Sequence, residues 1–460
     1  MPLSTEALLR DLPASFDADG IHYVLAQFVD VHGAAKVKLV PAKHLADVLT
    51  VGAGFAGGAV WGMGQGPHSH DMCARIDPAS YTPLPYEPGV ARFAADLHVD
   101  DLPHPYCPRV NLRRILDRAK SLGYVFNVGI EPEFFLVARR PDGSVESWDP
   151  HAIDDLSKPC YDFKAMSGAL GFLRAMQDGL NALGWGAYQA DHEDANAQFE
   201  VNFQYADALA TADRITFFRM MAGQIAQRFG AIATFMAKPF ARRTGSGAHM
   251  HYHLADAETG ANRFEVDPAS DPRGLGLSPL AYQFLGGIME HARALAAVTS
   301  PTVNCYKRLQ VGAALTGSRS GYTWVPAFVT YGDNNRTQML RVCGPGHVED
   351  RSVSSACNPY LAVAAYLAAG LDGIERNLDP GEPNLGGNMY QNHPEAMIAR
   401  GVATLPQSLD EALDRFEADP IVRESLGPIA DEFLSLKRAE WREYHAEVGA
   451  WEIRRYLTAL

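Results

Sequence analysis

The stretch "VGIEPEFFLV" (residues 128–137) decides the fold, because it places two glutamates inside an apolar run with the pattern of a β-strand. Side chains alternate between the two faces of a strand, so Glu131 and Glu133 point the same way. Two carboxylates on one face repel each other, and burial beside phenylalanines adds to that cost. We therefore expect a metal ion, an arginine or water opposite them. Pro132 lacks an N–H, which predicts an edge, a bulge or local strain at this point of the strand.

The size and charge of the chain exclude several classes of protein. Its 460 residues exceed the length at which one core stops growing, so we expect two domains. A net charge of −14 argues against nucleic acid or an anionic membrane as a partner, although a local basic pocket for an anionic substrate stays compatible with it. The sequence contains neither a secretory signal pattern nor an apolar run of about 18 residues. Six scattered cysteines without a CxxC pair indicate reduced thiols and a cytoplasmic location.

The spacing of apolar residues predicts a mixture of strands and helices. The proline-rich segment "DDLPHPYCPR" (100–109) precedes a helical pattern, and we place a domain boundary there, near residue 105. Before it we expect a short helix at 4–11 and a hairpin of strands at 21–30 and 34–40. After it we expect strands at 126–139, 198–204, 247–256 and 336–343, with helices at 110–123, 166–183, 213–229 and 358–370. A last helix opens at Pro428, and its apolar stripe runs to Trp451. Antiparallel strands interrupted by helices indicate an α+β fold.

Polar residues gather in four of these apolar segments. Besides Glu131 and Glu133, the chain offers Glu193 and Glu200 in "DHEDANAQFEVNF" (191–203), alternating histidines in "RRTGSGAHMHYHL" (242–254), and Glu349 in "GHVEDRSVSSACNPYL" (346–361). Any one segment alone is more often a solvated strand face. Together, five carboxylates and one imidazole suit Mg²⁺ or Mn²⁺ better than Zn²⁺. Five carboxylates are enough for two such ions, which normally bridge phosphate oxygens.

Four arginines extend this interpretation: Arg308, Arg336, Arg341 and Arg351. Arginine is suited to clamp a carboxylate or a phosphate bidentately. The chain has no GxxxxGK[ST] motif, which excludes a P-loop phosphate site. Read without any family, these residues indicate a two-metal phosphate enzyme.

In their order along the chain, these segments resemble the glutamine synthetase superfamily. "GIEPEFFLV" resembles its first metal-binding strand, "DHEDANAQFE" its paired-glutamate segment, and "ATFMAKPFARRTGSGAHMH" the signature that ends in a metal histidine. "NCYKRL", "NNRTQMLRV" and "VEDRSVSSACNPYL" are similar to its remaining arginine and glutamate motifs. The resemblance implies a small N-terminal β-grasp domain (1–105) and a large catalytic domain (106–460) with a curved antiparallel sheet flanked by helices. It also implies a homo-oligomer of stacked rings, with active sites at subunit interfaces.

The resemblance assigns roles residue by residue. One metal would be held by Glu133, Glu193 and Glu200, and the other by Glu131, His249 and Glu349. Arg308, Arg351 and Gly245 would bind glutamate, with Glu133 beside it. Arg336 and Arg341 would bind the phosphates of ATP, and His251 would lie near the nucleotide. The base that deprotonates the incoming amine stays open among Glu193, Asp162 and Tyr161. The implied cofactors are two or more Mg²⁺ or Mn²⁺ ions, with ATP as co-substrate.

Departures from the glutamine-forming pattern bear on the amine. Ala56 stands where those members carry an acidic ammonium-binding residue, unless the register is shifted and Asp71 serves instead. The flap glutamate after "YKR" is missing, the loop at 309–326 is long and carries Tyr322 and Trp324, and Thr244 replaces an asparagine. Less negative charge and more aromatic surface suit an alkyl- or arylamine.

These features resemble most the type III branch, which includes γ-glutamylmethylamide synthetases. We expect a ligase that joins the γ-carboxyl of L-glutamate to a small primary amine, with methylamine as the leading candidate, through a γ-glutamyl phosphate. Glutamine synthesis from ammonia is the first alternative. An inactive structural or regulatory homologue is the second, and the survival of all six metal ligands and four arginines speaks against it.

Overall fold

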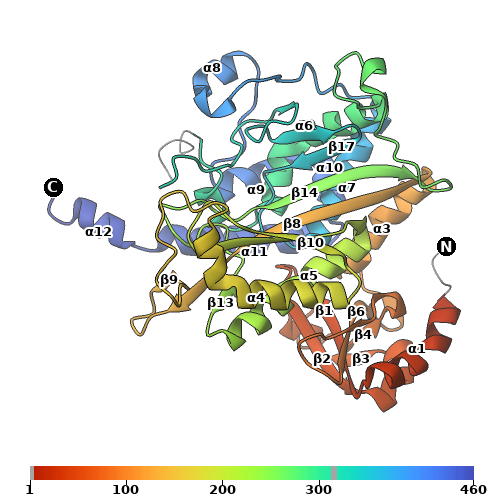
Figure 1. Ribbon diagram of the computed structural model, residues 1–460. Coiled ribbons are helices and arrows are strands. Elements are labelled where there is room, and N and C mark those ends of the chain that lie inside the picture. The colour runs from red at the N-terminus through yellow and green to blue at the C-terminus, as the bar shows by residue number, and fades with distance from the viewer. Residues whose placement is uncertain (1–4, 312–318, 460) are drawn as a thin grey trace.

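The structure is a computed structural model that describes residues 5–311 and 319–459, and these residues are organised on two sheets (Figure 1). The N-terminal sheet has the order β2-β1-β6-β4-β3, with β5 and β7 paired to β6. Only β1 and β6 pair in parallel. Its strands are β1 (Tyr23–Val29), β2 (Ala35–Pro41), β3 (Ala53–Phe55), β4 (Met72–Ile76), β5 (Thr82–Pro83), β6 (Val90–Val99) and β7 (Leu102–Pro103).

The predicted N-terminal hairpin is confirmed, and the predicted helix at 4–11 is too short. β1 and β2 pair antiparallel from Tyr23 opposite Pro41 to Val29 opposite Ala35. α1 (Thr5–Asp19) continues through Pro13, and α2 (Leu45–Thr50) follows the hairpin. α1 is extended because Leu12 and Phe16 keep the helical apolar spacing and are buried against this sheet, with Phe16 packed on Phe93.

The second sheet has the order β10-β11-β8-β14-β17-β16-β15, with β9, β12 and β13 also paired to β8. All these pairs are antiparallel except β15 with β16. β8 is 16 residues long and serves as the spine of the sheet. The strands are β8 (Tyr124–Arg139), β9 (Val145–Ser147), β10 (Ala187–His192), β11 (Gln198–Phe203), β12 (Ala206–Asp207), β13 (Ile232–Thr234), β14 (Ala248–Asp256), β15 (Tyr331–Gly332), β16 (Leu340–Gly344) and β17 (His347–Asp350).

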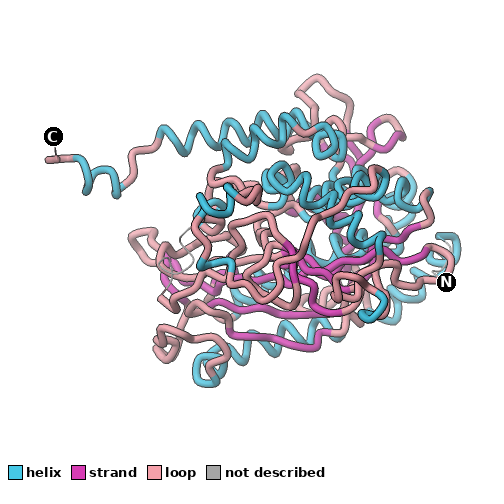
Figure 2. Tube along the Cα trace, turned by 90° about the horizontal axis from the view of Figure 1, so that it is seen from above, coloured by secondary structure: helices cyan, strands magenta, loops and turns pink. Residues whose placement is uncertain are grey.

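Helices lie on both sides of the band of strands (Figure 2). Those predicted at 110–123, 166–183, 213–229 and 358–370 are α3 (Pro108–Ser121), α4 (Phe163–Ala182), α5 (Ala208–Arg228) and α7 (Pro359–Glu375). α7 is almost wholly apolar and buried, and it packs against α6 (Pro279–Thr299) in the centre of the larger apolar cluster. The shorter helices are α8 (Pro394–Ala399), α9 (Leu409–Ala418) and α10 (Pro420–Ser425).

The C-terminal segment corrects one prediction, because the single helix expected from Pro428 to Trp451 is two helices. α11 (Ile429–Ala446) ends before Gly449, where α12 (Ala450–Tyr456) begins, and Glu452 caps the new start by accepting from the Gly449 N–H. Only the first part of the apolar stripe is buried, whereas Trp451 is 60% exposed. α12 projects from the body of the molecule (Figures 1 and 2).

Pro132 lies where β8 changes partners. Pairing with β11 runs from Phe135 to Glu133 and ends there, while pairing with β14 runs from Pro132 to Tyr124. The Glu133 N–H donates to the carbonyl of Gly247, just before β14 begins. Successive N–H groups of a strand point to opposite sides, so the nitrogen of Pro132 faces the side of β11, where that ladder has ended. A missing N–H costs nothing at that point. The structure thus resolves the predicted irregularity as the end of one ladder in a central strand.

The described residues fall into two main apolar clusters. One comprises side chains between Leu12 and Cys107, and the other runs from Val29 to Phe433. No helix in the described part of the chain is long and apolar enough to cross a membrane.

Candidate active site

Strand register places the predicted site residues on one face of the second sheet. His249 pairs with Glu131 across β14 and β8, and Glu200 pairs with Glu133 across β11 and β8. His251 pairs with Glu349 across β14 and β17, and Arg341 of β16 pairs with Glu349 on its other side. Paired residues point to the same face of a sheet. Five strands therefore direct carboxylates, imidazoles and a guanidinium into one space.

The acidic side chains and His249 form a close cluster. The Nε2 atom of His249 lies 3.4 Å from an oxygen of Glu133, and its Nδ1 atom lies 3.7 Å from Glu131 and 3.6 Å from Glu349. Glu133, Glu193 and Glu200 offer oxygens within 4.8 Å of one another. The predicted set Glu133, Glu193 and Glu200 thus forms one compact group. In the second predicted set, Glu131 and Glu349 both lie near His249, but the compact groups that contain Glu131 are those with Glu200 and His249, and with His251 and Glu349.

The electrostatics of this cluster differ from one side to the other. Burial, and next the charge of Glu133, raise the pKa of Glu193 to about 8. Burial and Glu131 likewise raise the pKa of Glu200 well above its usual range. For Glu349, burial opposes ionisation, but the charges of Arg351 and then His249 hold its pKa at about 2. The carboxylates around Glu193 and Glu200 therefore lack a cationic partner among the described residues.

The predicted arginines approach the pocket from the side of β16 and β17. Arg351 and Arg341 donate to the two oxygens of Glu349, at 2.7 and 2.9 Å. Arg308 is buried and donates to the backbone carbonyls of Arg351, Ser352 and Val353, while its buried Nε has no hydrogen-bond partner among the described residues. An unpaired buried donor of this kind suits an anionic ligand. Arg336 is exposed at the rim.

Two glycines let the backbone approach these groups. A Cβ on Gly245 would lie 2.3 Å from the carbonyl of Ala237, and one on Gly247 would lie 2.5 Å from a guanidinium nitrogen of Arg308. The N–H of Gly247 donates to Glu133 at 2.8 Å, and the carbonyl of Gly245 accepts from Gln198 at 3.1 Å. These contacts explain why "GSG" stands at 245–247.

Asp194 anchors the aromatic segment at residues 320–324. Its Oδ2 atom accepts from the Trp324 indole N–H and from the Thr244 hydroxyl, both at 2.9 Å, and from the Ser320 hydroxyl. Trp324 has φ 56°, a left-handed conformation that a tryptophan adopts only when its surroundings enforce it. Tyr322 packs on Trp324. The part of the loop at 312–318, which the sequence marks as unusual, lies outside the described residues.

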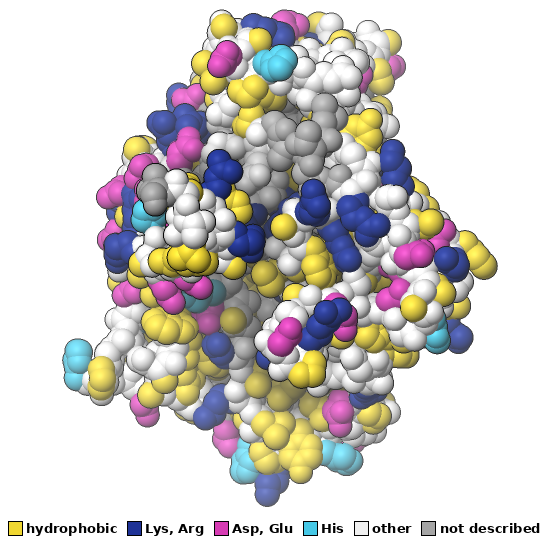
Figure 3. Space-filling model, turned by 90° about the vertical axis from the view of Figure 1, so that its left-hand side faces the viewer, with side chains coloured by type: hydrophobic (Ala, Val, Ile, Leu, Met, Phe, Trp, Pro, Cys, Tyr) yellow, Lys and Arg dark blue, Asp and Glu magenta, His cyan; other side chains and the backbone are white. Residues whose placement is uncertain are grey.

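A cavity of about 460 Å³ joins these groups. Its lining contains all the predicted metal ligands except Glu349, and also Gly245, Tyr161, Trp324 and the four arginines. The face of the molecule seen in Figure 3 is hollowed near its centre, and Lys and Arg side chains gather around the hollow. The acidic chain thus has a locally basic face.

Some predicted residues lie elsewhere. Asp162 caps α4 by accepting from the Ala165 N–H at 2.8 Å and is not part of the cavity lining, so the structure gives this carboxylate a structural partner. Ala56 and Asp71 are exposed in the N-terminal part and line no part of the cavity. His253 contacts Asn127 and Tyr205 further along β14.

Sequence reasoning also missed residues that the cavity contains. Lys158, Tyr188 and Asp194 line it, and Gln198 supports Glu133 at 3.1 Å. Asp194 adjoins Glu193, but nothing in its spacing distinguishes a loop anchor from a metal ligand.

His251 lies between two groups of the site. Its Nε2 atom is 3.2 Å from Glu131, while its Nδ1 atom is 2.7 Å from Nε2 of His347. Burial opposes protonation of His251, but hydrogen bonds with Cys343 and Glu131 raise its pKa to about 10. Burial and the charge of His251 lower the pKa of His347 to about 4. These pKa values make His251 the charged imidazole of the pair at neutral pH and His347 the neutral one.

The donor set fits hard divalent cations. Buried carboxylates that repel one another, together with one imidazole, are the ligands that Mg²⁺ and Mn²⁺ accept. An antiparallel sheet that carries such a set beside four arginines defines the class of glutamine synthetase-like catalytic domains. Residues 105–456 match the family model for the glutamine synthetase catalytic domain, and the chain belongs to this family.

Comparisons with known proteins agree with that assignment. The chain is 48% identical to the glutamate–methylamine ligase of Methyloversatilis universalis, over 95% of this chain and 96% of that protein. It is 41% identical to a glutamine synthetase of Rhizobium leguminosarum, over 96% and 98% of the two chains. A solved structure described as a GmaS/ADP complex superposes with a TM-score of 0.89 and 44% identity, over 97% of this chain and 99% of that one. These likenesses confirm the predicted glutamine synthetase-like α+β fold.

Proposed function

We propose that the protein is an ATP-dependent glutamate–amine ligase whose amine is methylamine. The observation that carries the proposal is the 48% identity to a glutamate–methylamine ligase along almost the whole of both chains. The likeness to a GmaS/ADP complex supports the nucleotide. The overall reaction converts glutamate, methylamine and ATP into γ-glutamylmethylamide, ADP and phosphate.

We propose that the carboxylate cluster holds two or more Mg²⁺ or Mn²⁺ ions. Glu133, Glu193 and Glu200 would hold one, and Glu131, His249 and Glu349 another. Bound there, the ions supply positive charge that neutralises the phosphoryl group during its transfer. The raised pKa values of Glu193 and Glu200 support this arrangement, because those carboxylates lack a cation of their own.

The arginines and Gly245 would bind and orient the two anionic substrates. Arg308 and Arg351 would hold glutamate, with Gly245 and Glu133 beside it, while Arg336, Arg341 and His251 would hold ATP. A γ-carboxylate oxygen of glutamate then attacks the γ-phosphorus of ATP, and ADP leaves. The amine nitrogen next attacks the γ-carbonyl carbon of the γ-glutamyl phosphate, phosphate leaves, and a base takes one proton from nitrogen.

Among the base candidates the geometry favours Glu193. Its side chain lines the cavity in which the two substrates would meet. Tyr161 also lines the cavity but is 70% exposed, and Asp162 is engaged as a helix cap.

The amine preference rests on the loop that Asp194 anchors. Tyr161 and Trp324 place aromatic surface at the cavity, where a methyl group gains from burial and an ammonium ion does not. The resemblance to ring-forming relatives further suggests that the Gly-rich segment at 51–66 of a neighbouring copy completes the site. We propose that the N-terminal domain and the catalytic domain meet at about residue 105, and the two apolar clusters support this boundary. Six free cysteines support a reducing, cytoplasmic environment.

An amine panel tests the proposal. Phosphate release is measured with ATP, glutamate and Mg²⁺, and kcat/KM is compared for methylamine, larger alkylamines and ammonium. We expect methylamine to give the highest value. A higher value for ammonium would make the protein a glutamine synthetase, like its 41% identical relative of that name. No turnover with any amine would favour the second alternative, an inactive structural or regulatory homologue.

Variants of Trp324 locate the preference. Trp324→Ala removes the aromatic surface, and we expect the methylamine-to-ammonium ratio of kcat/KM to fall about 10-fold, the scale of one buried methyl-sized contact. Trp324→Phe keeps an aromatic ring but loses the hydrogen bond to Asp194. It therefore distinguishes the effect of the aromatic surface from the effect of the hydrogen bond that anchors the loop. An unchanged methylamine-to-ammonium ratio of kcat/KM in both variants would show that this loop does not set the amine preference.

A further inference from the structure

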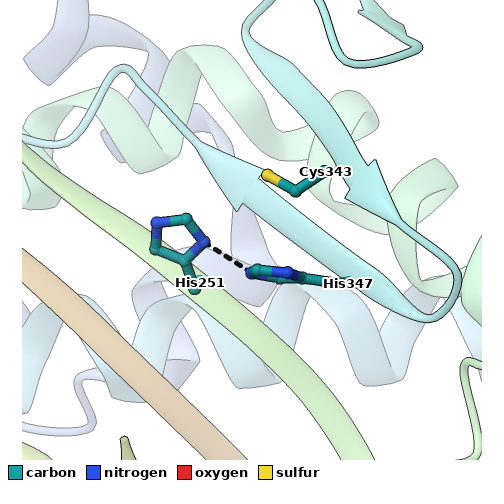
Figure 4. A group of neighbouring side chains, drawn as sticks. All are labelled: His251, Cys343 and His347. Atoms are coloured by element: carbon teal, nitrogen blue, oxygen red, sulfur yellow. Dashed lines mark hydrogen bonds between the residues drawn. The ribbon is translucent and has the colours of Figure 1, made fainter. Parts of the chain in front are cut away.

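One cluster near the active site has a ligand chemistry different from the rest. His251, Cys343 and His347 offer two imidazole nitrogens and a thiol sulfur within 4.8 Å of one another. Figure 4 shows the three side chains directed toward one another, His251 from β14 and the other two from the hairpin of β16 and β17. Every other such group among the described residues is built from carboxylates with at most one imidazole.

The hairpin assembles this cluster through a bulge. Val342 pairs with Val348 and Gly344 pairs with His347, so Cys343 is an extra residue in β16. A bulge re-aims the side chain of the extra residue, and here the sulfur lies beside the face that carries His347 and Glu349. On β14, His251 stands opposite Glu349 and presents its Nδ1 atom to His347 at 2.7 Å. The arrangement thus depends on strand register and not on a mobile loop.

We propose that His251, Cys343 and His347 bind Zn²⁺, at a site separate from the carboxylate cluster. Zn²⁺ takes imidazole nitrogen at 2.0–2.1 Å and thiolate sulfur at about 2.3 Å, so three ligand atoms of one tetrahedral ion stand roughly 3.3–3.6 Å apart. The cluster reaches that spacing by small side-chain rotations. A thiolate selects a borderline-soft ion over Mg²⁺ or Mn²⁺, which the carboxylates prefer.

Accessibility and the fourth ligand position agree with zinc. His347 is exposed and His251 and Cys343 are partly buried, so an ion enters from solvent. Three protein ligands leave one position for water. Metal binding at Nδ1 of His251 leaves the proton on Nε2, which lies 3.2 Å from Glu131. The zinc site and the carboxylate cluster would therefore share one histidine through its two ring nitrogens.

Cobalt spectroscopy tests this site without relying on turnover. The full-length protein is stripped with EDTA, saturated with Mg²⁺ to occupy the carboxylates, and titrated with Co²⁺. A cobalt–thiolate bond gives a charge-transfer absorption in the near ultraviolet that oxygen ligands do not give. We expect this band to appear with an endpoint of one equivalent and to disappear on addition of Zn²⁺.

Matched variants assign the band. Cys343→Ser removes the sulfur and should abolish it, whereas Cys73→Ser, a change at another partly buried cysteine, should retain it. His347→Gln changes an exposed side chain, leaves the fold intact and should weaken Co²⁺ binding at least 10-fold. Absence of the band in the wild-type protein at saturating Co²⁺ would overturn the proposal. Persistence of the absorption band in Cys343→Ser, or an unchanged affinity for Co²⁺ in His347→Gln, would also overturn the proposal.

Discussion

The active-site cluster and the joint between the two sheets both gather several carboxylates, but the two differ in how arginines pair with them. Each carboxylate of the joint has an arginine partner, whereas among the described residues of the cluster Glu349 alone has one. At the joint, Arg109 of α3 donates to Asp77 and Asp96 of the N-terminal part and to Asp213 of α5, at 2.7 to 2.9 Å. In the cavity, Glu133, Glu193 and Glu200 lie close together, and the nearest ion-pair contact given for any of them is that of Glu133 with His249, at 3.4 Å.

The pKa shifts record this difference. Burial works against ionisation of Asp77, but Arg109 holds its pKa below the usual range, whereas the pKa of Glu193 rises to about 8. A buried carboxylate with its own cation has its charge balanced within the fold, so removal of that cation is destabilising. Carboxylates without one destabilise the fold until a ligand brings the charge, which is how functional sites commonly differ from structural ones.

The largest effect should come from neutralising one cavity carboxylate. Glu133→Gln keeps the oxygen that accepts from Gly247 and Gln198 but removes a charge that the proposed metal requires. We expect kcat to fall on the order of 10³-fold or more, while the urea midpoint is unchanged or higher. Turnover and unfolding are measured on the same preparation, and near-normal turnover would show that Glu133 is no ligand.

The joint should respond in the opposite way. Arg109→Met removes the arginine partner of the buried Asp213 and leaves the partly buried Asp77 and Asp96 with Arg113 alone. We expect the free energy of unfolding to fall by about 3–5 kcal/mol. Arg113→Met is the matched control: its side chain is 39% exposed and shares Asp77 with Arg109, so we expect a loss below about 1 kcal/mol. Urea unfolding compares the two variants. Equal losses would mean that burial does not distinguish them.

The sequence predicts the cavity better than the joint, for a physical reason. Glu131, Glu133, Glu200, His249 and Glu349 lie on strands, and the two-residue period of a strand shows which side chains share a face. Arg109, Asp77, Asp96 and Asp213 come from four different segments, and only the tertiary structure brings them together. The same limit explains Asp194, whose partners lie 50 and 130 residues away in the chain.

Long elements were predictable and their ends were not. α7 and β8 follow from strong apolar patterns, and α3, α4 and α5 lie where spacing predicts helices, whereas α6 (Pro279–Thr299) was not predicted. The stripe from Ile429 to Trp451 keeps a helical period across Gly449, so periodicity alone gives one helix. The break arises from the local capping by Glu452, and the exposure of Trp451 shows that the stripe is not buried within this chain.

His291 offers an intermediate case, in which the cation that pairs buried carboxylates can be removed by pH. Its Nδ1 atom lies 2.7 Å from Asp419 and its Nε2 atom lies 3.0 Å from Asp372, which Arg376 also contacts. Burial opposes the charged form, but the hydrogen bonds to Asp419 and Asp372 raise the pKa of His291 above its usual value. Because the folded pKa is the higher one, the stabilisation is complete below about pH 6.5, the unfolded value, and is lost as pH rises through the folded pKa.

We expect His291→Asn to lower stability by roughly 1 kcal/mol at pH 6 and by less at high pH. Urea unfolding at a series of pH values checks this, with His393→Asn at an exposed histidine as the control. A difference between wild type and His291→Asn that does not shrink as pH rises would show that His291 is held neutral, and that the carboxylates at this position need no cation.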